Sequence, residues 1–156
     1  MRILGIDPGL QVCGYAVLDK NRGAEKLLEA GLVRTDSSTS IELRLNQVAK
    51  DFRALIKKFR PGLVAVEELY SHYAHPRTAI LMGHARGVIL QAAAAADIEV
   101  RSFSATRIKK AITGNGRASK MQMQKAIRSL LGLQKLPEPA DIADAIAAAL
   151  CCANEI

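Results

Sequence analysis

The sequence has few cysteines, few aromatic residues and no long apolar stretch. It contains no tryptophan and three cysteines, of which Cys151 and Cys152 are adjacent. This spacing suits neither a disulfide framework nor a zinc site, and it favours a reducing, cytoplasmic environment. No apolar run is long enough to cross a bilayer, so we expect no membrane segment. The N-terminus leads straight into a predicted strand, so we expect no signal peptide.

Acidic residues are outnumbered as well. The 156 residues include 22 Lys and Arg against 15 Asp and Glu, which gives a net charge of +7. Residues 101–125 hold seven basic side chains and no acidic one: Arg101, Arg107, Lys109, Lys110, Arg117, Lys120 and Lys125. Because charge of one sign repels itself, we expect a polyanionic partner such as nucleic acid. The length suits a single domain over residues 1–156.

Hydrophobic patterning predicts an α/β protein. Apolar runs at residues 3–6, 12–18 and 26–33 are separated by short turns and indicate an antiparallel meander. Helices are expected at 41–59, 79–95, 106–112, 119–131 and 141–152, and two further strands at 63–66 and 98–103. With 106–112 and 119–131 counted together, the order is βββαβαβα and a terminal helix. This is the plan of the ribonuclease-H-like fold, a five-stranded mixed sheet with helices on both faces.

Two local patterns concern the predicted helices. Thr39, with Glu42 three residues later, predicts a capping box at the start of the first helix. Ala79, Gly83 and Gly87 recur every four residues and make a stripe of small side chains on the second helix. Glycine inside a helix costs about 1 kcal/mol relative to alanine, which indicates a packing reason. A flat contact against the sheet and a contact between subunits both fit this stripe.

Two acidic residues directly follow predicted strands. Asp7 ends the first apolar run before a Pro8–Gly9 turn, and Glu67 ends the run 63–66. A strand–helix–strand crossover is expected to bring these two runs together in parallel, with both carboxylates at one end of the sheet. Aspartate before Pro-Gly also commonly hydrogen-bonds its own loop, so a turn-forming role for Asp7 stays open.

Two further acids begin the last predicted helix. Asp141 and Asp144 lie three residues apart and therefore share a helix face. Helix capping explains one acid at this position, whereas Asp144 lies one turn further inside an Ala/Ile stretch. Two carboxylates about 4 Å apart repel by roughly 4 kcal/mol at an effective dielectric near 20. A cluster of the four acids must therefore hold protons or bind cations.

The oxygen-only donors of such a cluster favour Mg²⁺ or Mn²⁺ over zinc. Two of these ions can activate water and stabilise the leaving oxygen of a phosphodiester. A basic chain that carries an acidic metal cluster thus combines what a nuclease needs, cations for the phosphate backbone and carboxylates for the chemistry.

Six segments, in order over almost the whole chain, resemble the bacterial RuvC Holliday-junction resolvases. They are GIDPG at 5–9, GYAV at 14–17, VEELY at 66–70, GHARGVIL at 83–90, TGNGRASK at 113–120 and DIADA at 141–145. The resemblance implies a ribonuclease-H-like fold, a homodimer and Mg²⁺ dependence with two ions per site, for which Mn²⁺ substitutes. It also implies paired cuts in a four-way DNA junction during recombination and repair, and a partnership with the RuvA–RuvB branch-migration complex.

Carried over by position, the resemblance makes Asp7, Glu67, Asp141 and Asp144 the catalytic, metal-binding acids. Glu67 rather than Glu68 matches, because it is the acid that directly follows the apolar strand. Strand alternation turns the two side chains to opposite faces, so only one can join the cluster.

The resemblance also implies DNA-binding residues, namely Tyr70, Lys109, Lys120, Arg117 and Asn115. Tyr70 takes the position of an aromatic residue that stacks on a base near the crossover, although an ordinary aromatic at the rim also fits. Lys109 and Lys120 match lysines near the scissile phosphate. The sequence departs from the family at His84, often Gln, and in the His- and Tyr-rich loop 71–76. For His72, His75 and His84 we favour packing over a metal site, since none has a close ligand partner in sequence.

Three rival functions remain. An RNA-processing nuclease of the YqgF type shares the first-strand motif, but the block 113–120 and the pair Asp141 and Asp144 argue against it. An actin-like ATPase lobe fits the Asp-Pro-Gly turn, although such proteins need two lobes. A non-catalytic junction-binding protein fits the charge but leaves the four acids unexplained.

Overall fold

The structure is a computed structural model that describes residues 1–21, 23–69 and 75–156. A meander of β1 (Arg2–Asp7), β2 (Val12–Asn21) and β3 (Ala24–Arg34) comes first. It is followed by α1 (Ile41–Phe59), β4 (Leu63–Glu67), α2 (Pro76–Ala94) and β5 (Glu99–Phe103), and then by α3 (Ala105–Thr113), α4 (Lys120–Leu130) and α5 (Ala140–Ala153). In the described part of the chain no helix is long and apolar enough to span a membrane.

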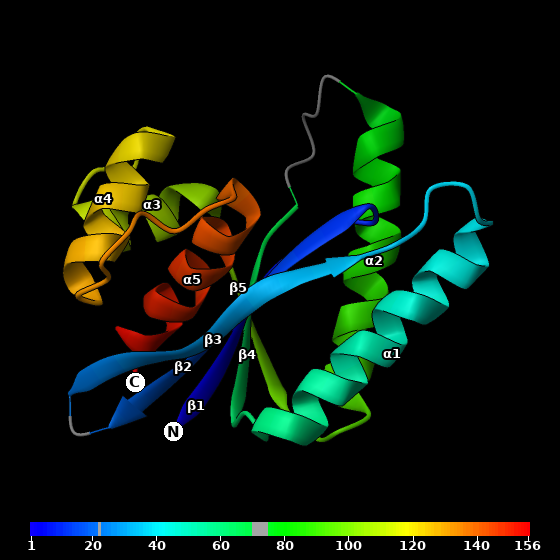
Figure 1. The fold of residues 1–156 in the computed structure, drawn as a ribbon, viewed down its shortest axis with the longest axis horizontal. Coiled ribbons are helices and arrows are strands. Elements are labelled where there is room, and N and C mark those ends of the chain that lie inside the picture. Colours follow the sequence, from blue (N-terminus) through cyan, green and yellow to red (C-terminus); the bar gives the residue numbers. More distant parts are fainter. Residues whose placement is uncertain (22, 70–74) are drawn as a thin grey trace.

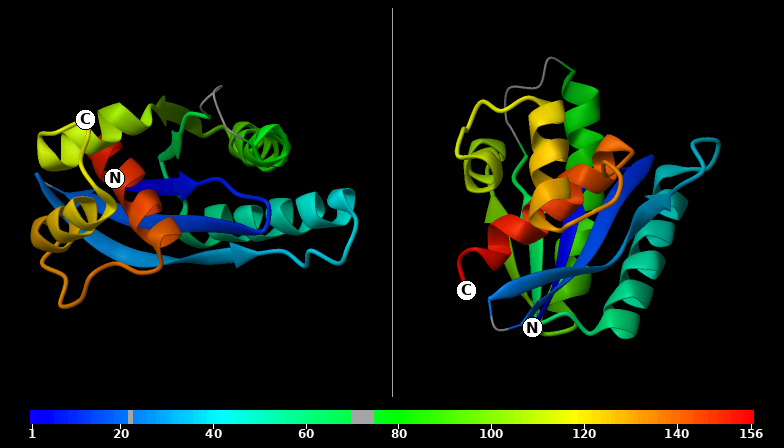
Figure 2. Two further views of the ribbon diagram at one scale, coloured as in Figure 1. Left: turned by 90° about the horizontal axis from the view of Figure 1, so that it is seen from above. Right: turned by 60° about the vertical axis from the view of Figure 1, so that its left-hand side comes forward.

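The five strands form one mixed sheet in the order β3-β2-β1-β4-β5. β1 pairs antiparallel with β2 and parallel with β4, and β4 pairs parallel with β5. The α1 and α2 helices cover one face of the sheet, while α3, α4 and α5 lie on the other (Figures 1 and 2). The predicted fold class, a ribonuclease-H-like sheet with helices on both faces, is therefore confirmed.

Strand alternation divides the core between the two faces. On β4, Leu63 and Ala65 pack with α5, whereas Val64 and Val66 pack with α1 and α2. Because successive side chains of a strand point to opposite faces, Glu67 falls on the α5 side. On β1, the Ile6 side chain packs with α1 and α2, so the side chain of the next residue, Asp7, points to the α5 side.

The α5 helix lies unusually close to the sheet because both surfaces are built from small residues. A Cβ atom on Gly5 of β1 would come within 2.2 Å of the Ala145 carbonyl oxygen. A Cβ atom on Gly14 of β2 would come within 2.0 Å of the Asp141 carbonyl oxygen. These glycines leave room for the helix backbone, and the contact at Gly14 fixes where α5 begins above the strands.

The predicted capping box at Thr39 is wrong. The α1 helix begins at Ile41 with Ser40 as its N-cap, and no side chain caps it. Thr39 instead closes a turn with Asp36, whose carbonyl accepts from both the backbone N–H and the hydroxyl of Thr39. A capping box does occur at α4, where Ser119 and Gln122 bond to each other's backbone.

The flat contact between the small-residue stripe of α2 and the sheet is also absent. The α2 residues buried against the sheet are Ala85, Ile89, Ala92 and Ala93. Among the residues that the structure describes, a Cβ atom on Gly87 would meet nothing within 4 Å, and one on Gly83 would touch Leu69 alone, at 3.7 Å. Both glycines line an open groove of about 440 Å³ between α1 and α2. The stripe therefore faces the groove beside α1 rather than the sheet, and the subunit contact stays a prediction.

Candidate active site

Three elements bring the predicted acids to one end of the sheet. The parallel register of β1 and β4 pairs Ile6 with Val66, so Asp7 and Glu67 follow side by side. On the other side of β1, Asp7 pairs with Gly14, against which the backbone of Asp141 packs. The first two turns of α5 thus lie over the ends of β1 and β2, and Asp144 lines a cleft together with Glu67.

The carboxylates are close enough to interact strongly. The pKa of Asp7 is raised from 3.8 to about 8, mainly by burial and then by the negative charges of Asp144, Glu67 and Asp141. Burial and the charge of Asp144 also raise the pKa of Glu67. Burial raises the pKa of Asp144, with a further contribution from Asp141. Without a cation the cluster therefore favours protonation, as expected for carboxylates crowded together in a partly buried site.

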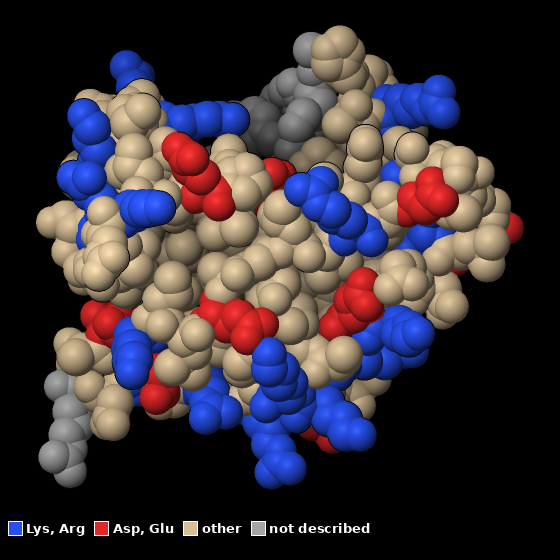
Figure 3. Space-filling view, in the orientation of Figure 1, with Lys and Arg blue, Asp and Glu red and all other residues tan. Residues whose placement is uncertain are grey.

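The two predicted lysines stand beside these acids. Lys109 of α3 and Lys120 of α4 line the same cleft as Glu67 and Asp144, with a volume of about 180 Å³. The charge of Lys120 lowers the pKa of Asp7 and Asp144, and that of Lys109 lowers the pKa of Glu67 and Asp144. The cleft therefore has an acidic floor and a basic wall. Lys and Arg side chains gather over α3 and α4 at this side of the molecule, and again over the C-terminal half of α1 (Figure 3).

The other predicted residues lie apart from the acids. Asn115 and Arg117 are exposed in the turn between α3 and α4. The Asn115 side-chain oxygen accepts from the Arg117 backbone N–H at 2.9 Å, so the amide also shapes the turn. Asn115 lines a second pocket, between α3 and α4, of about 390 Å³. Glu68 is exposed, and Tyr70 lies outside the described residues.

The donor set fits a hard divalent cation. The four acids offer only carboxylate oxygens, and burial together with neighbouring negative charge, which a cation would offset, raises the pKa of Asp7, Glu67 and Asp144. In the described ranges no three His, Cys, Asp or Glu side chains lie close enough together to hold one ion.

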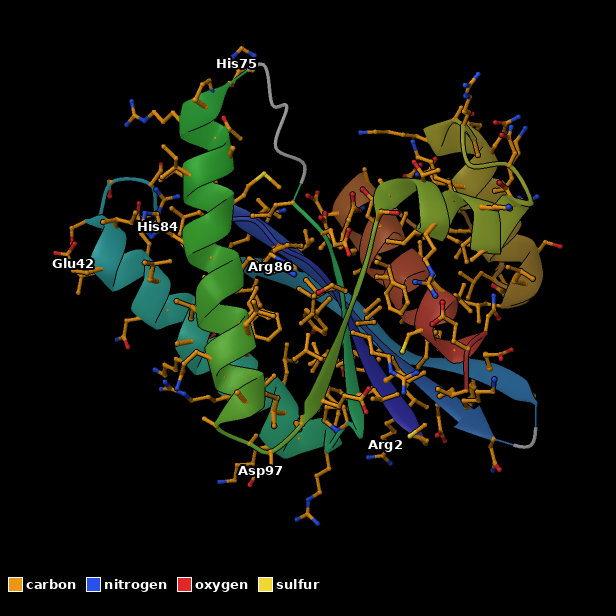
Figure 4. The ribbon with its side chains drawn as sticks, turned by 180° about the vertical axis from the view of Figure 1, so that it is seen from behind. Arg2, Glu42, His75, His84, Arg86 and Asp97 are labelled. Atoms are coloured by element: carbon orange, nitrogen blue, oxygen red, sulfur yellow. The ribbon has the colours of Figure 1, made fainter. Side chains whose placement is uncertain are left out.

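Arg86 contacts the backbone of Glu67, although no sequence pattern indicated a role for this residue. This α2 side chain donates to the Glu67 backbone carbonyl and to the Ser102 hydroxyl. The only sequence signal was an arginine inside a helix of mainly small and apolar residues. His84 lies on the same helix but turns to the groove beside α1, and His75 is its N-cap (Figure 4).

Comparisons with known proteins agree with this geometry. Residues 3–152 match the family model described as "Crossover junction endodeoxyribonuclease RuvC". A relative of that name from Rhodopirellula baltica is 49% identical over 96% of this chain and 84% of its own length. Another, from Heliobacterium modesticaldum, is 44% identical over 100% of this chain and 96% of its own.

A solved structure extends the comparison to three dimensions. The structure described as "T. thermophilus RuvC in complex with Holliday junction substrate" superposes with a TM-score of 0.91 at 33% identity, covering 97% of this chain and 92% of that one. The sequence-based resemblance is therefore confirmed, and the rival assignments to a YqgF-type nuclease and an actin-like lobe are set aside. The chain belongs to the RuvC family of crossover junction endodeoxyribonucleases.

Proposed function

We propose that the chain is a structure-specific, metal-dependent endonuclease that resolves four-way DNA junctions in recombination and repair. Family membership supports this activity, and the solved Thermus thermophilus relative is described as bound to a Holliday junction substrate. The observation that carries the proposal is the convergence of Asp7, Glu67 and Asp144 beside two lysines at one sheet end. A non-catalytic junction binder would have no reason to crowd acids where DNA phosphates must approach.

Asp7, Glu67, Asp141 and Asp144 are the metal-binding and catalytic residues in this proposal. They hold two Mg²⁺ ions, for which Mn²⁺ substitutes. Such ions, when bound, promote attack of water on the phosphodiester and stabilise the leaving oxygen. The protein's own contribution is to fix the carboxylates on two strand ends and one helix start. Burial keeps the site partly dry, which strengthens every charge interaction within it.

Basic side chains hold the DNA over the acids. Lys109 and Lys120 contact the phosphate next to the cut, and the pKa effects of both on the acids support this placement. Arg117 and Asn115 contact the phosphate backbone further along the same duplex arm. Tyr70 stacks on a base near the crossover, an assignment that falls outside the described residues and rests on the family motif alone.

The active form is a homodimer whose two-fold symmetry matches that of the junction. The groove between α1 and α2 supports this assembly, because Gly83 and Gly87 leave space that no part of the described chain fills. Ile80 of α2 and Leu43 of α1 are 61% and 59% exposed. These exposed apolar side chains, one on each helix, are available for contact with a second subunit.

Its wider setting follows from the family. We place residues 1–156 in a single domain that acts in the cytoplasm and cooperates with the RuvA–RuvB branch-migration complex. The free, buried cysteines Cys13, Cys151 and Cys152 are consistent with a reducing compartment.

The test compares two isosteric substitutions. Asp7→Asn removes one charge from the cluster, whereas Asp51→Asn removes one from α1, where Asp51 only accepts from Gln47. With a synthetic four-way junction and Mg²⁺, Asp7→Asn abolishes cleavage and leaves junction binding intact. Asp51→Asn retains both activities. Cleavage by Asp7→Asn at the wild-type rate would refute the role of Asp7.

A further inference from the structure

Arg86 contacts the strand end that carries Glu67, but from the opposite face of the sheet. Its Nη2 donates to the Ser102 hydroxyl of β5 at 2.8 Å, and its Nε donates to the Glu67 backbone carbonyl at 3.4 Å. The side chain is partly buried and reaches from the inner side of α2 toward the strands (Figure 4). One guanidinium therefore joins α2, β4 and β5 directly behind the acid cluster.

The backbone of Glu67 needs a donor at this point. The Glu68 N–H donates to Phe103 of β5 at 2.9 Å. Because backbone polar groups of successive strand residues turn to opposite sides, those of Glu67 turn toward β1. The parallel pairing of β1 with β4 extends as far as Ile6 and Val66. In a continued ladder, the Glu67 carbonyl would accept from the backbone N–H of residue 8 on β1. Residue 8 is Pro8, which has no N–H.

We infer that Arg86 is a positioning residue that replaces the missing ladder donor and so fixes the end of β4. The fork of the guanidinium suits this task, since it holds two acceptors on different strands in one plane. Glu67 then turns its carboxylate to the α5 face while its carbonyl is held from the α2 face. This inference rests on the proposed function of Glu67 as a metal-binding acid.

Arg2 provides a matched control. Its Nη1 donates to the Phe59 backbone carbonyl at 2.8 Å, and it lies at the opposite end of the sheet from the acids (Figure 4). Arg86→Gln and Arg2→Gln each remove a guanidinium that donates to a backbone carbonyl, and Arg2 is the more exposed of the two residues. A purely structural role for Arg86 predicts that both variants lose thermal stability and that neither changes metal binding.

Mn²⁺ binding to the metal-free protein, followed by electron paramagnetic resonance, separates the two roles. Removal of a group that orients a metal ligand typically weakens metal affinity by about 10-fold or more, and we expect this of Arg86→Gln. Arg2→Gln keeps the wild-type Mn²⁺ affinity. Hydrogen exchange at the Glu68 amide accelerates in Arg86→Gln alone, because the end of β4 loses its anchor.

A double-mutant comparison shows whether Arg86 acts through Glu67. In a Glu67→Gln background, Arg86→Gln causes no further loss of Mn²⁺ affinity, because the ligand that it orients is already gone. An equal loss in both backgrounds, or wild-type Mn²⁺ affinity in Arg86→Gln, would overturn the inference. Should Arg86→Gln not fold, Arg86→Lys, which cannot span both acceptors, carries the same comparison. A wild-type protein that binds Mn²⁺ but cuts no junction would overturn the proposed function and leave this result valid.

Discussion

Asp7 is the residue on which the site depends most. Its strand, β1, lies between β4, which carries Glu67, and β2, over which α5 begins. Glu67 and the two α5 acids, Asp141 and Asp144, all place negative charge near Asp7. The sequence placed Asp7 at the end of a buried strand, as the structure does, because an acid that follows an apolar run is visible without a structure. Its strongly raised pKa depends on burial and on three acids that are distant in sequence, so only the fold reveals it.

The raised pKa of Asp7 makes the metal-free protein sensitive to pH. A folded-state pKa near 8 against 3.8 means that the folded protein binds the extra proton between these values. Stability from this group is therefore intact below about pH 4 and is lost as the pH rises toward 8. We expect the melting temperature in EDTA to fall over this range, and Mg²⁺ to reverse the loss.

Asp7→Asn should remove most of that pH dependence. At pH 8.5 in EDTA, the variant no longer buries a charge beside three other acids, so it is more stable than wild type by on the order of 1–3 kcal/mol. Thermal unfolding of both proteins at pH 5 and pH 8.5 measures the difference. If the difference in stability between the two proteins is no larger at pH 8.5 than at pH 5, the Asp7 carboxylate ionises in the folded protein at little cost in free energy.

At the scale of elements, the close contact of α5 with the sheet sets the geometry of the site. Gly14 and Gly5 provide the space for it, and the Ala-rich sequence of α5 provides the flat partner surface. The sequence predicted this helix and its two acids almost to the residue. It could not show that the backbone of Asp141 would pack against Gly14, because the two residues are far apart in sequence.

Gly14→Ala should separate the acids. The added Cβ atom would lie 2.0 Å from the Asp141 carbonyl oxygen, so α5 must move away from β2. We expect a loss of about 1–3 kcal/mol in unfolding free energy, together with weaker Mn²⁺ binding. Chemical denaturation and metal titration test both. An unchanged stability would mean that the helix start is held less firmly than the packing indicates.

Other elements show where local sequence patterns mislead. Thr39 and Glu42 have the capping-box spacing, but the Asp36 turn takes the Thr39 hydroxyl and moves the helix start to Ile41. The stripe of Gly83 and Gly87 could not be assigned to a face before the position of α2 was known. The task of Arg86 depends on the register of β1 and β4 and on Pro8, which are far apart in sequence.

The whole molecule has two distinct working surfaces in this account. The acidic cleft with its basic wall lies at the α3, α4 and α5 side, and the open groove lies between α1 and α2. We have proposed that the cleft serves chemistry on DNA and the groove serves assembly, so a defect in one should leave the other intact.

Ile80→Glu tests the assembly surface. A charge at this 61% exposed position would be buried in the subunit contact, so we expect sedimentation to show a shift from dimer to monomer. Leu130→Glu on α4 is the matched control, since Leu130 is 57% exposed and lies away from the groove. A dimer that persists in Ile80→Glu, or one that Leu130→Glu also disrupts, would place the contact elsewhere.

The central claim is that crowded carboxylates make this chain cut four-way junctions only when a divalent cation joins them. The most direct measurement incubates a synthetic mobile junction and a linear duplex of the same sequence with the protein, with and without Mg²⁺, and maps the cuts. We expect paired cuts at symmetric positions in opposite strands of the junction, and only when Mg²⁺ is present. Cleavage in EDTA, or equal cutting of the linear duplex, would contradict it.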